Sequence, residues 1–169
     1  PAHERARALN AIAETLLLRK SEFVETIISE AGKPVTFAEA EVDRAASTFR
    51  FAGALAIQDE GHGIRMDASP QGLGHFGQVK RITPFNFPLN LVAHKVAPCI
   101  ASGNVMILKP ALKTPLTALL LAEVLESAGV PPGQINIVPF DHEVVDALLA
   151  DSRIKMLSFT GGVAVGWNL

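Results

Sequence analysis

The sequence has one cysteine, Cys99, so it cannot form an internal disulfide, and a reducing cytoplasm is the expected compartment. Its five histidines are scattered, and none stands at a metal-site spacing from Cys, Asp or Glu, so no metal is predicted. No apolar run approaches the roughly 20 residues that cross a bilayer. The opening residues, PAHERARALNAI, are charged and helical, unlike a signal peptide. We therefore expect neither a membrane nor a secretory protein.

The sequence also lacks a large excess of either positive or negative charge. The formal net charge is -2, which argues against a nucleic-acid partner or an acidic membrane surface. The 169 residues, 49% of them hydrophobic, are enough for one domain with a buried core. The chain starts and stops inside helical patterns, so we expect it to be a piece of a longer polypeptide.

The first third of the chain is predicted to be helical. Apolar residues recur there at helical spacing until AGKP (31–34) interrupts the pattern. A new helix is expected from Thr36, capped by its hydroxyl with Glu39 reaching back. Its predicted core face is Phe37, Ala40, Ala45, Phe49, Ala52 and Ala56. We assign 1–57 to N-terminal helices and the glycine-rich 58–78 to a β-hairpin.

From residue 79 to residue 169 strands and helices alternate with short links. The expected strands are VKRI (79–82), NVMILKP (104–110), INIVPF (135–140) and IKMLSFTGG (154–162). Such alternation predicts an α/β fold with a parallel sheet, right-handed crossovers and flanking helices. Thr114 is expected to cap the helix that follows the second strand, with Pro115 at its first position. Ligands on such sheets bind at the carboxyl ends of the strands.

The stretch TPFNFPLN (83–90) places an amide between two aromatic rings at one of these strand ends. The NH₂ group of Asn86 can donate to a developing oxyanion, and Phe85 and Phe87 are expected to exclude water and hold its rotamer. The alternative is an asparagine that bonds local backbone in a turn.

Three further features have a functional and an ordinary interpretation. Lys109 ends an apolar strand and could reach the ribose or phosphate of a nucleotide, or could be a solvated strand-end lysine. GGVAVG (161–166) could bring backbone close to a pyrophosphate, or could be a plain glycine turn. It matches neither the dinucleotide fingerprint nor the P-loop. Cys99, in VAPCIAS, is interpreted as a packing residue and not as a nucleophile.

Together these segments resemble the aldehyde dehydrogenase superfamily, in its NAD(P)-dependent, CoA-independent branch. The motifs that carry the resemblance are ITPFNFPLNLVAHKVAPCIASGN, VMILKPALKTP, AGVPPGQINIVP and SFTGGVAVG, with a weaker match over EAGKPVTFAEAEVDRA. The resemblance implies a Rossmann-like cofactor-binding sheet over 79–169 and an oligomerisation hairpin over 58–78.

The resemblance also implies roles for individual residues. Asn86 matches the asparagine that donates to the substrate carbonyl oxygen, and Lys109 matches the lysine that contacts the adenosine ribose. The turn 159–162 matches the one that lies against the cofactor diphosphate. The implied cofactor-binding positions are Thr83, Pro84, Phe85, Asn86, Lys109, Ala111, Leu112, Phe159, Thr160, Gly161, Gly162 and Gly166.

Departures from the family pattern carry predictions of their own. Leu112 and Lys113 stand where many members have a ribose-binding glutamate and its neighbour, so a 2′-phosphate should be accepted and NADP should serve as cofactor. Gly162 replaces a serine whose hydroxyl contacts the diphosphate. Phe140 replaces a glycine after the third strand, so the family's cofactor contacts are not expected there.

The implied activity is oxidation of a small aldehyde to a carboxylic acid with NAD or NADP, through a cysteine thiohemiacetal. In the family the nucleophilic cysteine and the general-base glutamate lie downstream of the fourth strand, so the printed chain is expected to be inactive alone. A homodimer or tetramer is implied for the intact protein. The alternatives are a CoA-acylating or phosphate-reductase relative on the same fold, and a non-catalytic fragment.

Overall fold

The computed structural model describes residues 1–58, 78–82, 84–141 and 143–168. Three helices come first: α1 (Ala2–Leu18), α2 (Lys20–Ala31) and α3 (Val35–Gln58). The strands are β1 (Gln78–Ile82), β2 (Val105–Lys109), β3 (Ile135–Ile137) and β4 (Ile154–Phe159). The remaining helices are α4 (Asn90–Ala101), α5 (Leu116–Ser127), α6 (Glu143–Leu149) and α7 (Val163–Trp167).

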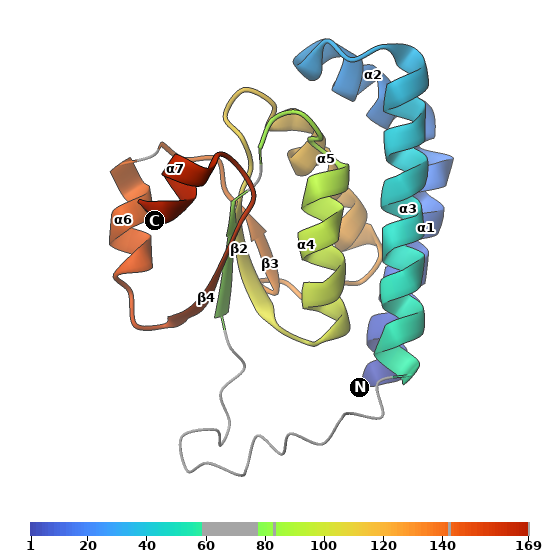
Figure 1. Ribbon diagram of the computed structural model, residues 1–169. Helices are drawn as coiled ribbons and strands as arrows, with labels where there is room; N and C mark the ends of the chain where they lie inside the picture. Colours follow the sequence, from blue (N-terminus) through green and yellow to red (C-terminus); the bar gives the residue numbers. More distant parts are fainter. Residues whose placement is uncertain (59–77, 83, 142, 169) are drawn as a thin grey trace.

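The four strands form one parallel sheet in the order β3-β2-β1-β4. The chain moves outward from β1 to β3 and then crosses back to place β4 beside β1. Helices α4 and α5 lie on one face of the sheet, and α6 and α7 lie on the other (Figure 1). The predicted parallel α/β arrangement is therefore confirmed. β3 is shorter than expected and ends before Pro139, which has no N–H for a ladder hydrogen bond.

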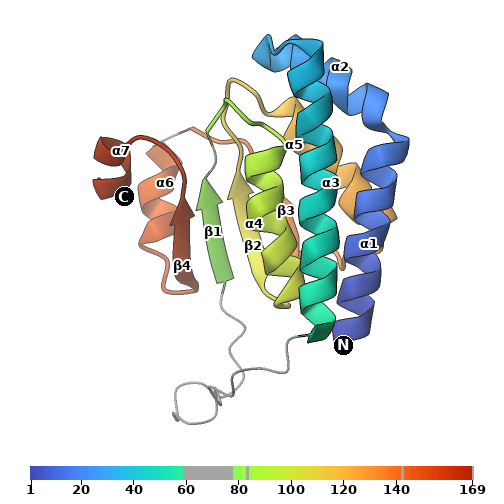
Figure 2. The same ribbon diagram turned by 45° about the vertical axis from the view of Figure 1, so that its right-hand side comes forward.

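The N-terminal helices form an outer layer, with α1 and α3 packed side by side and against α4 (Figures 1 and 2). One core cluster joins buried residues from α1 through α5. On α3 the predicted core positions Ala45, Phe49, Ala52 and Ala56 are buried. The prediction was wrong for Phe37, which is 64% exposed, and for Ala40, which is also exposed.

The first turn of α3 explains this error. The helix begins at Val35, and its first backbone bonds run from Phe37 and Ala38 to the carbonyl of Pro34. Thr36 therefore lies inside the first turn, and the predicted capping box is wrong. The face that meets α1 and α4 starts at Ala38 and leaves Phe37 in solvent.

Two helices are capped by glutamates from distant parts of the sequence. Thr114 does not cap α5. Instead Glu30 accepts hydrogen bonds from the N–H groups of Leu116 (2.7 Å) and Thr117 (3.0 Å). Glu41 does the same for α4, as described below. A carboxylate at a helix N-terminus satisfies free N–H groups and is favoured by the helix dipole.

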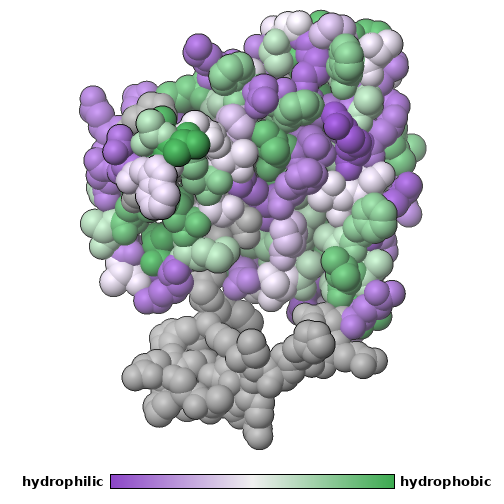
Figure 3. Space-filling model, viewed as in Figure 1, coloured by the Kyte–Doolittle hydropathy of each residue, from purple (hydrophilic) through white to green (hydrophobic). Residues whose placement is uncertain are grey.

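Several large apolar side chains of the described residues are exposed. On the face seen in Figure 3 they gather around α7 and β4, and again over α3. The exposed members on α3 include Phe51, Leu55 and Ile57, and those near α7 include Met156, Val163, Val165 and Trp167. None of the helices in the described ranges is both long and apolar enough to cross a membrane.

The predicted hairpin falls almost wholly on residues 59–77, which lie outside the described residues, and so does Thr83. In the part of the chain that the structure describes, no cluster of His, Cys, Asp and Glu has the geometry of a metal site.

Candidate functional site

The carboxyl ends of the strands bring the predicted site residues to one edge of the sheet. Ile82, the last residue of β1, pairs in register with Lys109 of β2 and with Phe159 of β4. The loops 84–90, 110–115 and 160–162 therefore leave the sheet at the same level, and Figure 2 shows β1, β2 and β4 pointing the same way. The direction in which the chain crosses reverses between β1 and β4, which is where ligands bind to sheets of this kind.

The backbone around Asn86 is held, while its side chain faces solvent. The Nζ of Lys33 donates to the Asn86 carbonyl oxygen (2.9 Å) and lies 4.0 Å from the centre of the Phe87 ring. Phe87 is half-buried, but Phe85 is 55% exposed, so the expectation that both rings would shield the amide was wrong for Phe85. Among the hydrogen bonds of the described residues, none involves the Asn86 amide. The amide is therefore available to an incoming group.

Lys109 is buried, with 2% of its surface exposed, so the alternative of a solvated strand-end lysine is wrong. Burial lowers the pKa of its ammonium group, and the carboxylate of Asp141 acts in the opposite direction. Its Nζ lies 5.7 Å from the centre of the Phe140 ring. Within the described part of the chain, no hydrogen-bond acceptor is found for this Nζ. A desolvated cation of this kind favours a ligand that brings oxygen atoms.

The loop after β2 lies beside the loop after β1. The Thr114 hydroxyl donates to the Phe85 carbonyl (3.5 Å), and the Nζ of Lys113 is 5.6 Å from the centre of the Phe85 ring. Leu112 is 43% exposed and Ala111 is half-buried. A cation and an open apolar side chain thus stand next to Lys109, and no carboxylate belongs to this loop.

The glycine turn after β4 is shaped by one aromatic ring. A Cβ at Gly161 would collide with the Phe159 ring, and a Cβ at Gly166 would come within 3.1 Å of it. Gly162 has open space around it and takes the N-cap position of α7 with φ -67° and ψ 143°. Phe159, Thr160, both of these turn glycines and Gly166 line an open hollow of about 480 Å³.

Lys95 lies at the same edge of the sheet and was not predicted from the sequence. It is 5% exposed, and its Nζ donates to the hydroxyls of Ser158 (3.1 Å) and Thr160 (2.9 Å). It thereby joins α4 to the carboxyl end of β4. The available signal was a lysine inside the otherwise apolar stretch VAHKVAPCIA.

Cys99 does not belong to this edge of the sheet. It is 1% exposed, and its Sγ donates to the Asn104 carbonyl (3.4 Å). It lies nine positions after Asn90 in α4, which corresponds to about 13 Å along the helix axis. Its interpretation as a packing residue is confirmed.

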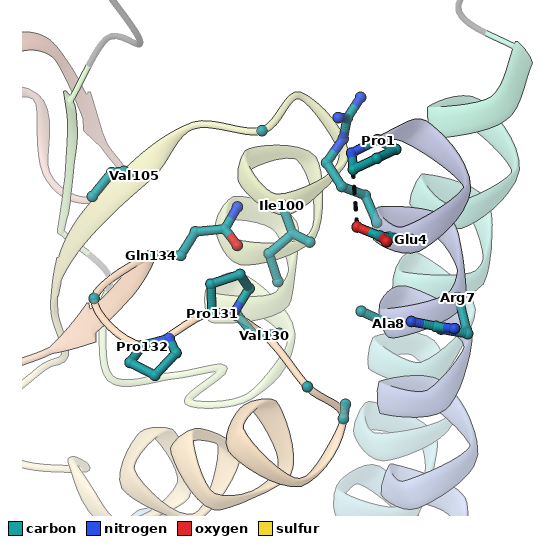
Figure 4. Close-up of a pocket in the computed structure, with 15 residues that line it drawn as sticks. Pro1, Glu4, Arg7, Ala8, Ile100, Val105, Val130, Pro131, Pro132 and Gln134 are labelled. Atoms are coloured by element: carbon teal, nitrogen blue, oxygen red, sulfur yellow. Dashed lines mark ion pairs between the residues drawn. The ribbon is translucent and has the colours of Figure 1, made fainter.

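A cavity of about 620 Å³ lies at the opposite, amino-terminal end of the sheet. It is lined by the start of α1, by Ile100 and Val105, and by the turn 130–134 (Figure 4). None of the predicted site residues lines this cavity, so it is separate from the strand-end site.

Comparison with known families decides what kind of protein carries this site. The model of the aldehyde dehydrogenase family matches residues 1–169. The chain belongs to the aldehyde dehydrogenase family. The resemblance drawn from the sequence motifs is confirmed at the level of the family.

Individual relatives show how much of the family protein the chain covers. It is 38% identical to 3-sulfolactaldehyde dehydrogenase of Priestia aryabhattai over 97% of this chain and 36% of that protein. It also resembles aldehyde dehydrogenase 21 of Physcomitrella patens, solved with the reaction product succinate (TM-score 0.88, 40% identity, 99% of this chain and 37% of that one). The chain therefore spans just over a third of the length of these relatives.

The same fold occurs with bound cofactor in other family members. The NADP complex of glyceraldehyde-3-phosphate dehydrogenase from Methanocaldococcus jannaschii matches with a TM-score of 0.87 and 34% identity, covering 99% of this chain and 38% of that one. Solved relatives thus bind NADP, or NAD⁺ in another case.

Proposed function

We propose that this chain forms the cofactor-binding part of an NAD(P)-dependent, CoA-independent aldehyde dehydrogenase that oxidises a small aldehyde to a carboxylic acid. The observation that carries the proposal is the buried Lys109 ammonium at the same sheet edge as the glycine turn and Asn86. The family match and the cofactor complexes of relatives support it.

The residues present fit a dinucleotide. Lys109 would donate to ribose hydroxyls, which would supply the acceptors that its Nζ lacks among the described residues. The turn 160–162 would let backbone approach the diphosphate closely, with the Lys95-held Thr160 beside it. Residues 84–86 would lie along the nicotinamide end of the cofactor. When bound, the cofactor accepts the hydride.

Asn86 would act on the aldehyde itself. Its NH₂ donors would hold the oxygen of the carbonyl as negative charge develops there. The nucleophilic cysteine and the general base would be supplied by the length that relatives have beyond this chain. We call a polypeptide that contains this chain and that length the complete protein.

The finer organisation is also a proposal. We propose that 1–57 and 79–169 form one cofactor-binding unit and that 58–78 is an oligomerisation hairpin. The complete protein would then be a cytoplasmic homodimer or tetramer. Light scattering coupled to size-exclusion chromatography should give a mass of two or four chains, and a monomer would contradict this assignment.

Replacing Lys109 by methionine is expected to weaken cofactor binding without loss of stability. The variant removes the donor to the ribose, so the dissociation constant of NAD and of NADP should rise about 10-fold, the loss expected for one charge-assisted hydrogen bond. Burial lowers the pKa of this lysine, so the unfolded chain binds more protons between the folded and unfolded pKa values, and wild-type stability rises with pH there. Below that range the buried charge costs stability, so the variant should melt at the same or a higher temperature at pH 7.

Isothermal titration and thermal unfolding of the same preparations measure both effects. The matched control is Lys155→Met, an exposed lysine that bonds the Ser152 carbonyl (2.6 Å). Unchanged cofactor affinity in the Lys109 variant would count against the proposed function.

Replacing Gly162 by serine is expected to strengthen cofactor binding. The site has room for a side chain, its φ and ψ suit serine, and its N-cap position favours a hydroxyl. The new hydroxyl can donate to the diphosphate, so affinity should rise a few-fold, in line with about 1 kcal/mol for a hydrogen bond. Gly161→Ser is the control, because its Cβ would collide with Phe159 and should weaken binding. Equal effects of the two substitutions in titration would contradict this reading of the turn.

A further inference from the structure

A buried ion pair holds the loop that carries Asn86: it joins Glu41 of α3 to Lys33, which lies in the link between α2 and α3. Glu41 is fully buried on the apolar face of α3. Its Oε1 accepts hydrogen bonds from the N–H groups of Leu89 and Asn90, both at 3.0 Å, and its Oε2 pairs with the Nζ of Lys33. Because a buried carboxylate is costly unless its oxygens are paired and hydrogen-bonded, these three contacts are what allow Glu41 to lie there.

Lys33 contacts the same loop on the other side of Phe87 from Leu89 and Asn90. Its Nζ donates to the Asn86 carbonyl (2.9 Å) and lies over the Phe87 ring, while the side chain is only 13% exposed. The pair therefore holds the chain upstream of Phe87 through one carbonyl and downstream through two amides. Gly32 takes the left-handed φ of 63° that ends α2 just before Lys33, and Pro34 restricts the backbone just after it.

We propose that Lys33 and Glu41 are positioning residues that set the direction of the Asn86 amide. They fix the peptide group between Asn86 and Phe87, and this sets how the Cα of Asn86, and with it the side chain, is oriented relative to the loop. The proposal rests on the proposed function, in which the amide must meet a carbonyl oxygen. A buried ion pair is weak evidence for stability, since apolar pairs of similar volume are often as stable or more so. The specific hydrogen bond to the Asn86 carbonyl is what an apolar pair could not supply.

The test compares three variants of the complete protein. Lys33→Met should lower kcat about 10-fold or more, because small misplacement of a catalytic group is costly, while the KM for the cofactor changes less than two-fold. It should also melt earlier, since it leaves Glu41 unpaired. The double variant Lys33→Met/Glu41→Leu removes the unpaired carboxylate but also the acceptor of the Leu89 and Asn90 amides, so it should recover only part of the melting temperature and none of kcat. A control is Lys20→Met, which breaks the exposed ion pair of Lys20 with Asp43 (2.7 Å) and should leave kcat unchanged.

The Asn86→Ala background separates positioning from general damage. There Lys33→Met should lower kcat no further, because the group that it positions is absent. A full wild-type kcat in the double variant, or an equal loss in the Asn86→Ala background, would overturn the proposal.

Hydrogen exchange at the Leu89 and Asn90 amides measures their hydrogen bonds to Glu41 independently of catalysis. Exchange should be slow in the wild type and at least 10-fold faster in Glu41→Leu. Fast exchange in the wild type would overturn the positioning role. Slow exchange in a protein that oxidises no aldehyde would overturn the proposed function, but the Glu41 and Lys33 contacts with the loop would stand.

Discussion

Replacing Asn86 by alanine in the complete protein is expected to lower kcat about 100-fold to 1,000-fold, the usual cost of losing one oxyanion donor. The amide is exposed, and among the described residues it makes no hydrogen bond, so its removal should leave the melting temperature unchanged. The Lys33 contact is to the main-chain carbonyl and survives the substitution. The loss should therefore fall on kcat, with little change in the KM for NAD or NADP.

Steady-state kinetics with a panel of small aldehydes measures this effect. Asn10→Ala, at an exposed asparagine of α1, is the matched control and should behave as wild type. A parallel rise in the cofactor KM would mean that the loop itself has been disturbed, and an unchanged kcat would remove Asn86 from the mechanism.

Introducing a carboxylate at Leu112 is expected to turn the cofactor preference toward NAD. Leu112 is exposed beside Lys113, and Lys109 lies three residues before it at the end of β2. In Leu112→Glu the new carboxylate would accept hydrogen bonds from a ribose 2′-hydroxyl and repel a 2′-phosphate. A like-charge contact costs several kcal/mol when close. The ratio of kcat/KM for NADP to that for NAD should fall at least 10-fold, by about 1.4 kcal/mol or more.

The control for this prediction carries the same substitution far from the site. Leu55→Glu, on the exposed side of α3, changes the net charge equally and should leave the ratio unchanged. A wild-type protein that already binds a 2′-phosphate cofactor far more weakly than NAD would contradict the premise that Leu112 and Lys113 accept it.

The strand-end loops show how far local sequence reaches. The alternation of apolar runs with helical patterns predicted four parallel strands, and the position of TPFNFPLN, KP and TGG after three of them predicted a common edge. These features depend on residues adjacent in sequence and on a general property of parallel sheets, so no tertiary information was needed. The inert character of Cys99 followed from its apolar neighbours in the same way.

The errors have a common origin in contacts between distant segments. Thr114 looked like a helix cap, but Glu30, in another helix, reaches the free N–H groups of α5. Phe37 was predicted to lie in the core and Phe85 to shield the Asn86 amide, but both side chains are more than half exposed. Hydrophobic identity predicts which side chains can be buried, whereas the packing partner determines which ones are.

What the sequence by itself determined is therefore the order of elements, the parallel sheet, the edge where the predicted site residues meet and, through its motifs, the family. Only the tertiary structure decided that Lys109 is desolvated, that Lys95 holds Thr160, and that Lys33 and Glu41 grip the Asn86 loop. The Lys95 and Lys33–Glu41 contacts depend on charged groups that meet partners up to 65 positions away, whereas the state of Lys109 depends on its burial. Burial and long-range pairing set the free energy of such charged groups, and neither can be predicted from the residues next to them in sequence.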